Sequence, residues 1–183
     1  MNAEETRAAP PQTNDIVSRD ALSERSSAAP ATIVTRVRID APREQVWRGL
    51  AFYEQIADPP PWYLRLILPV PLGTHGEKAK VGGLVTCLYE RGHLIKRITR
   101  IEEGFHYGFE VSEQKLEVAG VRLHGGSYSL RELTSEWTEV AVTTRYTSPR
   151  RPRRIARMLE AAACHLFHRH LVASILRALP RSS

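Results

Sequence analysis

The stretch HLIKRITRIEEGFHYGFEV, residues 93–111, predicts two neighbouring antiparallel β-strands that meet in a tight turn at Gly104. Its second half places a large apolar side chain at every other position, which is the period of a strand with one buried face. These side chains belong to Phe105, Tyr107, Phe109 and Val111. The preceding segment GLVTCLYE, residues 83–90, joins the first strand through Arg91-Gly92. The region therefore predicts three consecutive strands of a meander.

Four further segments have the alternation and the β-branched and aromatic content that are typical of strands. They are TIVTRVRID (32–40), KLEVAGVRLH (115–124), GGSYSLREL (125–133) and TEVAVTTRYT (138–147). The glycine pairs at 82–83 and 125–126 are interpreted as bulges or strand entries. The sequence thus predicts about seven antiparallel strands.

Two short helical pieces are expected after the first of these strands. The first begins near Pro42, a residue that suits the first turn of a helix, and both pieces have apolar residues at helical spacing. The apolar residues are Val46, Trp47 and Leu50 in the first piece and Phe52, Tyr53 and Ile56 in the second. The next segment, DPPPWYLRLILPVPLG (58–73), contains five prolines. Proline excludes a continued helix and a central strand, so the segment is predicted to be a long apolar loop.

A long helix over residues 152–179 is predicted to close the chain, with a length of about 40 Å at 1.5 Å per residue. One strand, two short helices, a run of antiparallel strands and a long terminal helix together predict an α+β fold. In this fold a curved sheet of about seven strands wraps around the terminal helix.

The chain resembles the SRPBCC superfamily over residues 32–178. The segments that carry the resemblance are RIDAPREQVW (38–47), YERGHLIKRITRIEEG (89–104), FHYGFEV (105–111), LHGGSYSLREL (123–133), VTTRYTSP (142–149) and the terminal helix. This is the helix-grip fold that START lipid-transfer domains, the birch-pollen allergen and polyketide cyclases share. The resemblance implies a deep apolar cavity between sheet and helix that holds a hydrophobic small molecule. It supplies no universal catalytic residue.

Length and composition favour one soluble domain, since 183 residues with 42% hydrophobic residues can build one core. Residues 1–31 lack apolar periodicity and are expected to form a disordered tail, which leaves 32–179 as the folded domain. The chain has no membrane-spanning run and no secretory signal at its start, so a cytoplasmic protein is expected. Two distant cysteines, Cys87 and Cys164, favour neither a disulfide framework nor a zinc ribbon.

Candidate ligand-binding residues come from the apolar loop and from polar side chains that face the expected cavity. The loop offers Trp62, Tyr63 and Leu66 as a lid or as a permanently packed cover. The cavity candidates are Tyr89, Glu90, Arg97, Tyr107, Tyr128, Arg145 and His168. Glu90 and Arg97 are also expected to pair across the hairpin, which would be structural. The sequence does not decide which of these side chains face inward.

The segment CHLFHRH, residues 164–170, raises the question of a metal site in the terminal helix. Cys164, His165 and His168 share one face at helical spacing, but His170 points elsewhere, so coordination would be incomplete and no metal is expected. The helix also has two apolar stripes, which lie on different faces and exchange at this segment. The first stripe begins at Ile155, and the second ends at Leu179. A bend, a cover on both sides of the helix, or contact of the distal half with a partner or membrane would each explain this change. Covering on both sides is favoured, with His168 as a structural histidine.

The charge excess of the chain lies at its C-terminus, where residues 148–183 hold eight arginines against Glu160. Five of these arginines cluster at the start of the terminal helix, namely Arg150, Arg151, Arg153, Arg154 and Arg157. The cluster is interpreted as a solvated basic face or as a contact with phosphate headgroups. Nucleic acid is not expected, because no stacking aromatic residues accompany the cluster. No dinucleotide, phosphate-loop or hydrolase motif occurs, so no cofactor is expected.

Three functions remain open on the sequence alone. The first is binding of a hydrophobic small molecule or lipid in the cavity. The second is polyketide cyclase/dehydrase-like catalysis in the same cavity, with Tyr89, Glu90 or Arg97 acting on a bound substrate. The third is a peripheral membrane or partner-binding module that uses the basic C-terminal region.

Overall fold

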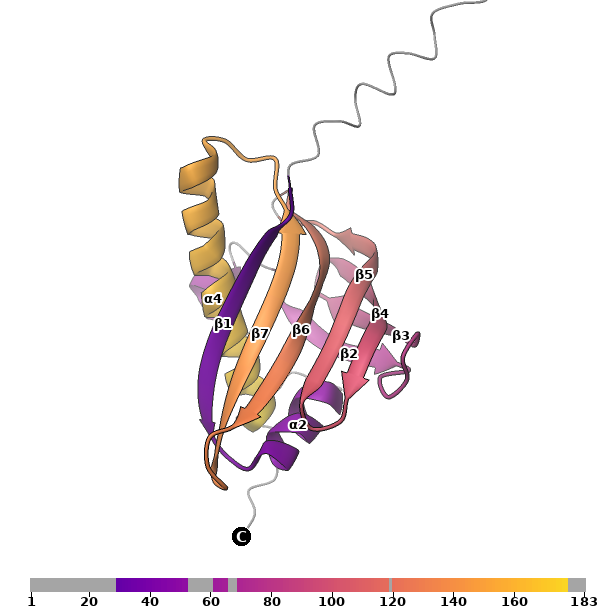
Figure 1. Cartoon of the computed structure of the whole chain (residues 1–183). Coiled ribbons are helices and arrows are strands. Elements are labelled where there is room, and N and C mark those ends of the chain that lie inside the picture. Colours follow the sequence, from indigo (N-terminus) through magenta and orange to yellow (C-terminus); the bar gives the residue numbers. More distant parts are fainter. Residues whose placement is uncertain (1–28, 53–60, 66–68, 119, 178–183) are drawn as a thin grey trace, which may run out of the picture.

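The computed structural model describes residues 29–52, 61–65, 69–118 and 120–177. In these residues the chain forms a curled antiparallel sheet of seven strands, with a long helix along its concave side (Figure 1). The strand order is β1-β7-β6-β5-β4-β3-β2, so the first and last strands of the chain pair with each other. All other neighbours in the sheet are consecutive along the chain, as a meander requires. None of the described helices is both long and apolar enough to cross a membrane.

The elements have the following bounds. The strands are β1 (Ala31–Asp40), β2 (Pro71–Gly76), β3 (Leu84–Tyr89), β4 (Gly92–Glu102), β5 (His106–Leu116), β6 (Arg122–Glu132) and β7 (Trp137–Thr147). The helices are α2 (Arg43–Phe52), α3 (Trp62–Arg65) and α4 (Arg153–Arg177). This order confirms the predicted α+β helix-grip fold. The second helical piece, expected around Tyr53 and Ile56, and the last two positions of the predicted terminal helix lie outside the described residues.

Strand β2 corrects the interpretation of the proline-rich segment as loop throughout. It pairs with β3 at the open edge of the sheet, and its first residue is Pro71, which pairs with Tyr89. Proline is tolerated at the first residue of an edge strand because no neighbour there needs its missing N–H group. The same segment also contains the single turn of helix α3.

The segment KLEVAGVRLH does not form a strand of its own. Strand β5 continues to Leu116 and β6 begins at Arg122, so a turn divides the segment between the two strands. Gly120 in this turn has a φ of 77°, a left-handed conformation that glycine adopts without steric cost. The number of strands is therefore seven as predicted, but β2 replaces the separate strand expected at 115–124.

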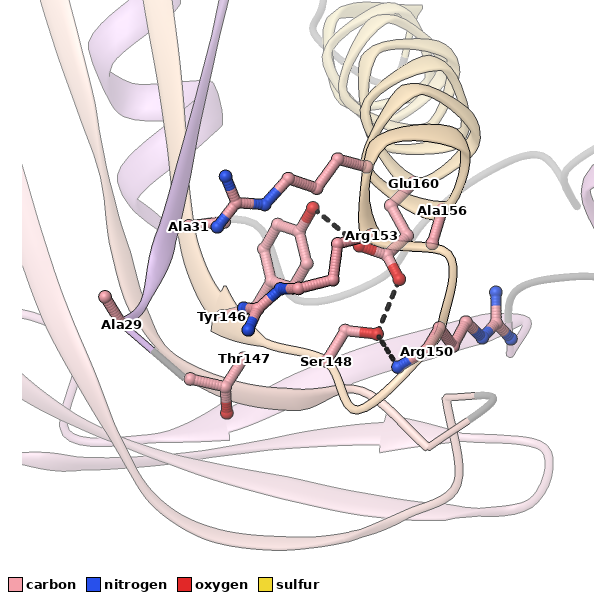
Figure 2. Close-up of a pocket in the computed structure, with 10 residues that line it drawn as sticks. Ala29, Ala31, Tyr146, Thr147, Ser148, Arg150, Arg153, Ala156 and Glu160 are labelled. Atoms are coloured by element: carbon pink, nitrogen blue, oxygen red, sulfur yellow. Dashed lines mark hydrogen bonds between the residues drawn. The ribbon is translucent and has the colours of Figure 1, made fainter. Parts of the chain in front are cut away.

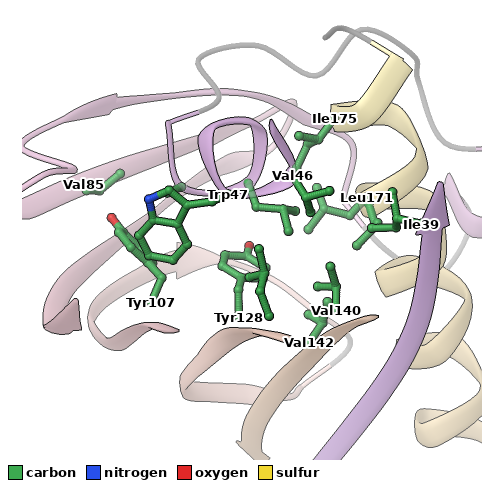
Figure 3. Close-up of a cluster of buried hydrophobic side chains, with 14 of the residues drawn as sticks. Ile39, Val46, Trp47, Val85, Tyr107, Tyr128, Val140, Val142, Leu171 and Ile175 are labelled. Carbon is green, nitrogen blue, oxygen red and sulfur yellow. The ribbon is translucent and has the colours of Figure 1, made fainter. Parts of the chain in front are cut away.

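The core lies between the concave face of the sheet and helices α2 and α4 (Figure 3). Its most deeply buried members come from both helices and from the sheet. They are Val46 and Leu50 on α2, Ile98 on β4, Val140 on β7, and Val172 and Ile175 on α4. Burial of such side chains contributes about 25 cal/mol for each Å² of apolar surface removed from water. Helix α2 and the second half of α4 are thereby held against the sheet.

Helix α4 packs against the core with its second half only. Its buried residues are His168, Leu171, Val172, Ser174 and Ile175. In the first half, the apolar stripe that starts at Ile155 is exposed to solvent. The favoured explanation for the change of stripe, a helix covered on both sides, is therefore wrong for the described residues. Contact of the distal half with a partner is wrong as well, because that half lies in the core.

Candidate functional site

Three of the predicted tyrosines lie on the concave face in the half of the sheet formed by β3 to β6. Tyr107 and Tyr128 are buried, and Tyr89 is half-buried against the same core. The rings of Tyr107 and Tyr128 lie 6.4 Å apart, and Trp47 on α2 meets Tyr107 edge-on with centroids 6.2 Å apart. Figure 3 shows Trp47, Tyr107 and Tyr128 grouped at one end of the core. We call Trp47, Tyr107 and Tyr128 together the aromatic wall.

Lys96 on β4 joins these tyrosines, although it is absent from the predicted site. It pairs with Val85 on β3 and with Val111 on β5, and cross-strand partners point to the same face of a sheet. Val85 is buried in the core, so the side chain of Lys96 starts from the concave face. Its Nζ lies 4.4 Å from the centroid of the Phe109 ring, at the distance of a cation–π contact.

The ammonium of Lys96 acts on the tyrosines electrostatically. Burial raises the pKa of Tyr107 to about 12, and the nearby Lys96 partly opposes this rise. Burial also raises the pKa of Tyr89, again against the effect of Lys96. Both phenols are therefore neutral at physiological pH and can donate hydrogen bonds. The Tyr107 hydroxyl donates to the carbonyl oxygen of Lys78 at 2.9 Å, which holds its ring in place.

Lys96 could have been found from the alternation of its own strand. Leu94 and Ile98 are buried, and Lys96 lies between them at the two-residue period. A lysine between apolar cross-strand partners on the inner face is unusual, because lysine side chains are mostly exposed. The concave face thus combines an aromatic wall with the positive charge of Lys96.

The structure separates two of the predicted residues from this group. Arg97 is exposed and pairs with the exposed Leu84, so it lies on the convex face of the sheet. Glu90 is exposed in the turn after β3, with its Oε1 3.7 Å from Nη2 of Arg65. The predicted pairing of Glu90 with Arg97 across the hairpin is therefore wrong. A ligand on the concave face cannot contact Arg97.

The remaining predicted residues lie elsewhere in the chain. Trp62 on α3 is largely exposed, and α3 lies against α4. Arg145 lies on the convex face with its Nη2 3.8 Å from Oε1 of Glu110. The side chain of Tyr63 and the whole of Leu66 lie outside the described residues. Of the two, only the backbone of Tyr63 is placed, within α3.

His168 forms a polar contact between α4 and the sheet rather than part of the aromatic wall. Its Nδ1 lies 2.7 Å from Oγ1 of Thr35 on β1, and its Nε2 lies 2.8 Å from Oγ1 of Thr144 on β7. The Nδ1 of His165 lies 2.7 Å from the same Thr35 oxygen. Burial lowers the pKa of His168 to about 4, and His165 adds to this effect, so the imidazole is neutral at physiological pH.

Cys164 contacts His168 within α4. Sγ of Cys164 lies 3.4 Å from Nε2 of His168, and burial raises the pKa of this thiol to about 11. A neutral thiol is a poor metal ligand and a poor nucleophile. Among the described residues no group of three or more histidine, cysteine or acidic side chains is arranged to hold a metal ion.

A shallow surface pocket, open to solvent, lies between the start of α4 and the end of β7 (Figure 2). Its floor holds Glu160, which accepts hydrogen bonds from the hydroxyl groups of Tyr146 at 3.1 Å and Ser148 at 2.6 Å. Three arginines line it, namely Arg150, Arg153 and Arg157. This pocket lies at the end of the sheet, away from the aromatic wall.

No protein-family model matches the chain, and no curated protein matches it. Several solved structures do share its fold. Zhui aromatase/cyclase from Streptomyces sp. R1128 has a TM-score of 0.54 and 15% sequence identity, over 81% of this chain and 94% of its own. A START superfamily protein from Mycobacterium smegmatis has a TM-score of 0.57 and 11% identity, over 81% and 96%.

Norcoclaurine synthase from Thalictrum flavum, in complex with dopamine and hydroxybenzaldehyde, has a TM-score of 0.55 and 11% identity, over 93% of this chain and 100% of its own. At these identities the similarity establishes the architecture alone. It supports the resemblance to helix-grip proteins at the level of the fold.

Proposed function

We propose that this helix-grip protein binds a hydrophobic small molecule on the concave face of its sheet, with Lys96 as the polar anchor. The observation that carries the proposal is the position of the Lys96 ammonium, 4.4 Å from the Phe109 ring and near Tyr89 and Tyr107 on the inner face. An anionic or carbonyl oxygen of a ligand could accept a hydrogen bond from this ammonium.

The aromatic wall favours a flat, aromatic ligand. Aromatic contacts contribute about 0.5 to 1.5 kcal/mol beyond the burial of their surface, and Tyr89 and Phe109 are the half-buried rings of this face that a ligand could reach. The phenol of Tyr89, kept neutral by its raised pKa, can donate a further hydrogen bond to a ligand oxygen. Apolar burial would therefore supply most of the affinity, and Lys96 with Tyr89 would orient the molecule.

The solved structures support this class of ligand. The norcoclaurine synthase of the same fold holds dopamine and hydroxybenzaldehyde, which are small aromatic molecules with oxygen substituents. The START superfamily structure and the aromatase/cyclase share the fold as well. The similarity is too low to transfer a substrate, but this architecture accommodates ligands of the size and chemistry that the concave face of this chain favours.

A cyclase or dehydrase activity on the same face is the second candidate. The observation that favours it is the proximity of a cationic amine to neutral phenols. Solvent would take the α-proton of the substrate, and the ammonium of Lys96 could stabilise the resulting enolate oxygen. The Tyr89 phenol could give a proton to a leaving hydroxyl group that departs as water, and it would regain that proton from solvent. Arg97 and Glu90 have no part in this proposal because neither lies on the concave face.

The test is a comparison of two neighbouring substitutions in the same strand. Binding of anilinonaphthalene sulfonate, an apolar anionic fluorophore, would be measured by fluorescence titration for Lys96→Met and for Arg97→Met. Loss of a charged hydrogen bond predicts about tenfold or greater weakening for Lys96→Met. Arg97→Met should bind as the unchanged protein does, because Arg97 lies on the other face. Equal affinities of the two variants would contradict the proposed site.

Catalysis is distinguished from binding with a linear poly-β-carbonyl compound as the probe. If the protein is a cyclase, a cyclised, dehydrated product should appear in mass spectra as a loss of water. Formation of this product should stop in Lys96→Met and persist in Arg97→Met. Tight binding of the probe without any mass change would leave ligand binding as the function and remove the cyclase candidate.

A further inference from the structure

The first half of α4 carries an exposed apolar face, which we call the α4 ridge. The ridge consists of Ile155, Met158, Leu159, Ala162 and Leu166, with the four large side chains 59%, 73%, 65% and 45% exposed in that order. Helical spacing places these residues on the side of α4 opposite His168 and Ile175, which are buried against the sheet. The ridge extends for about 16 Å along the helix.

Five arginines lie in and just before the first turns of α4, where the ridge begins. Arg150, Arg151, Arg153, Arg154 and Arg157 are all exposed, and no ion pair among the described residues includes any of them. Glu160 is the single acidic residue from 148 onwards. Its two carboxylate oxygens already accept hydrogen bonds from Tyr146 and Ser148. The cluster therefore keeps its positive charge.

The positive charges of these arginines are destabilising at this place in the fold. The N-terminus of a helix carries a partial positive charge, so arginines there are destabilising, and five like charges within eight residues also repel one another. An anionic partner would relieve both effects. Arg154 precedes Met158 by four residues, so its guanidinium flanks the ridge on the same side of the helix.

We propose that the α4 ridge and its arginines dock on a membrane surface that contains acidic phospholipid. The ridge would enter the boundary between headgroups and acyl chains, and the arginines would contact lipid phosphates. This inference uses no residue of the concave face, so it stands apart from the proposed function.

Two features favour a membrane over a protein partner. The ridge is a convex helix face, and a fluid lipid surface can accommodate it without a matching groove. A second copy of the chain would bring a further five arginines to the contact, and like charges across an interface disfavour association. Acidic lipid supplies both an apolar layer and the opposite charge.

The experiment is co-sedimentation of the full chain with vesicles. One set would contain phosphatidylcholine alone, and the other equal parts of phosphatidylcholine and phosphatidylglycerol. We expect binding to the acidic vesicles that declines as sodium chloride is added, and little binding to phosphatidylcholine. Circular dichroism would confirm that each variant remains folded.

Two variants test the two halves of the surface. Arg150→Gln with Arg151→Gln and Arg154→Gln should weaken binding by about fivefold for each arginine, which corresponds to about 1 kcal/mol per charge. Met158→Gln with Leu159→Gln should weaken it by about tenfold or more through loss of apolar burial. Each variant has a matched control that should keep binding. The control for charge is the triple variant Arg36→Gln, Arg38→Gln and Arg122→Gln. The control for exposed apolar area is the double variant Leu84→Gln and Leu88→Gln.

Several results would overturn the proposal. The protein could stay in the supernatant with acidic vesicles at low salt, or the control variants could lose as much binding as the ridge variants. Inorganic phosphate could release the protein where chloride of equal ionic strength does not, which would assign the arginines to a free anion. Dissociation of a dimer by Met158→Gln with Leu159→Gln would assign the ridge to a second copy of the chain.

Discussion

His168 on α4 and Thr144 on β7 are joined by a hydrogen bond of 2.8 Å between Nε2 and Oγ1. The other ring nitrogen of His168 is paired with Thr35 on β1 at 2.7 Å, so one imidazole links the helix to both strands. A neutral imidazole has one N–H donor and one acceptor, and the two threonine hydroxyls can satisfy both. Protonation would turn the acceptor nitrogen into a second donor inside a buried contact.

Acidification should therefore destabilise the protein through His168. In the folded chain its pKa is lowered from 6.5 to about 4, so between these values the unfolded chain takes up a proton that the folded chain does not. The free energy of unfolding should fall as pH falls from about 6.5 towards 4. For a shift of this size the loss is up to about 3 kcal/mol. Urea denaturation at a series of pH values measures it.

His168→Gln isolates this contribution, because burial also lowers the pKa of the half-exposed His106 and adds to the acid sensitivity of the protein. The variant should be less stable than the unchanged protein at pH 7 but lose less stability on acidification. Exposed His75 provides the control, since His75→Gln should leave the pH dependence as it is. Parallel pH curves for His168→Gln and the unchanged protein would refute the assignment.

Removing one threonine partner should also weaken the contact between helix and sheet. Thr144→Val keeps the shape of the side chain but leaves the His168 Nε2 with the thiol of Cys164 at 3.4 Å as its remaining neighbour. A buried polar group that loses its partner costs about 1 to 3 kcal/mol. Thr143→Val, one residue earlier and on the opposite face, should change stability by less than about 0.5 kcal/mol. Similar losses at both positions would contradict the role of Thr144.

The strands of the meander could be predicted because each has one buried face, and alternation reports such a face directly. Strand β2 could not, since its only distinguishing property is its place at the sheet edge, which makes Pro71 acceptable. The boundary between β5 and β6 depends on the left-handed φ of Gly120, and the apolar residues on either side of that glycine read as one continuous strand.

The candidate site shows the same limit. The three tyrosines were predicted and lie on the concave face, but Lys96 was not, because a lysine in a strand usually points to solvent. For α4, the helical pattern correctly predicts two apolar stripes. Which stripe is buried depends on how far the sheet reaches along the helix, and that is a tertiary property. The exposed stripe at Ile155 therefore becomes visible only in the fold.

Truncation of the core should be costly at the contact between α2 and the sheet. Leu50 is almost fully buried, and Leu50→Ala would remove its contacts and leave a cavity, with an expected loss of about 2 to 5 kcal/mol in the free energy of unfolding. Leu72 on the edge strand β2 is half exposed, so Leu72→Ala should cost less than about 1 kcal/mol. Thermal or urea denaturation of the two variants compares them. Equal losses would show that α2 does not pack as described.

Two glycines with positive φ, Gly82 in the connection between β2 and β3 and Gly92 at the start of β4, provide a test of how tightly the sheet is packed beside Gly92. Gly92 has a φ of 136°, and a Cβ atom there would collide with the backbone carbonyl of Lys115 on β5. Gly82 has a φ of 85° but open space around it. Gly82→Ala should therefore cost only the backbone strain of about 1 to 2 kcal/mol. Gly92→Ala should cost clearly more, because β4 and β5 must separate at this point to relieve the collision. Denaturation curves of the two variants measure the difference. A Gly92→Ala variant as stable as Gly82→Ala would mean that Lys115 on β5 does not lie against Gly92.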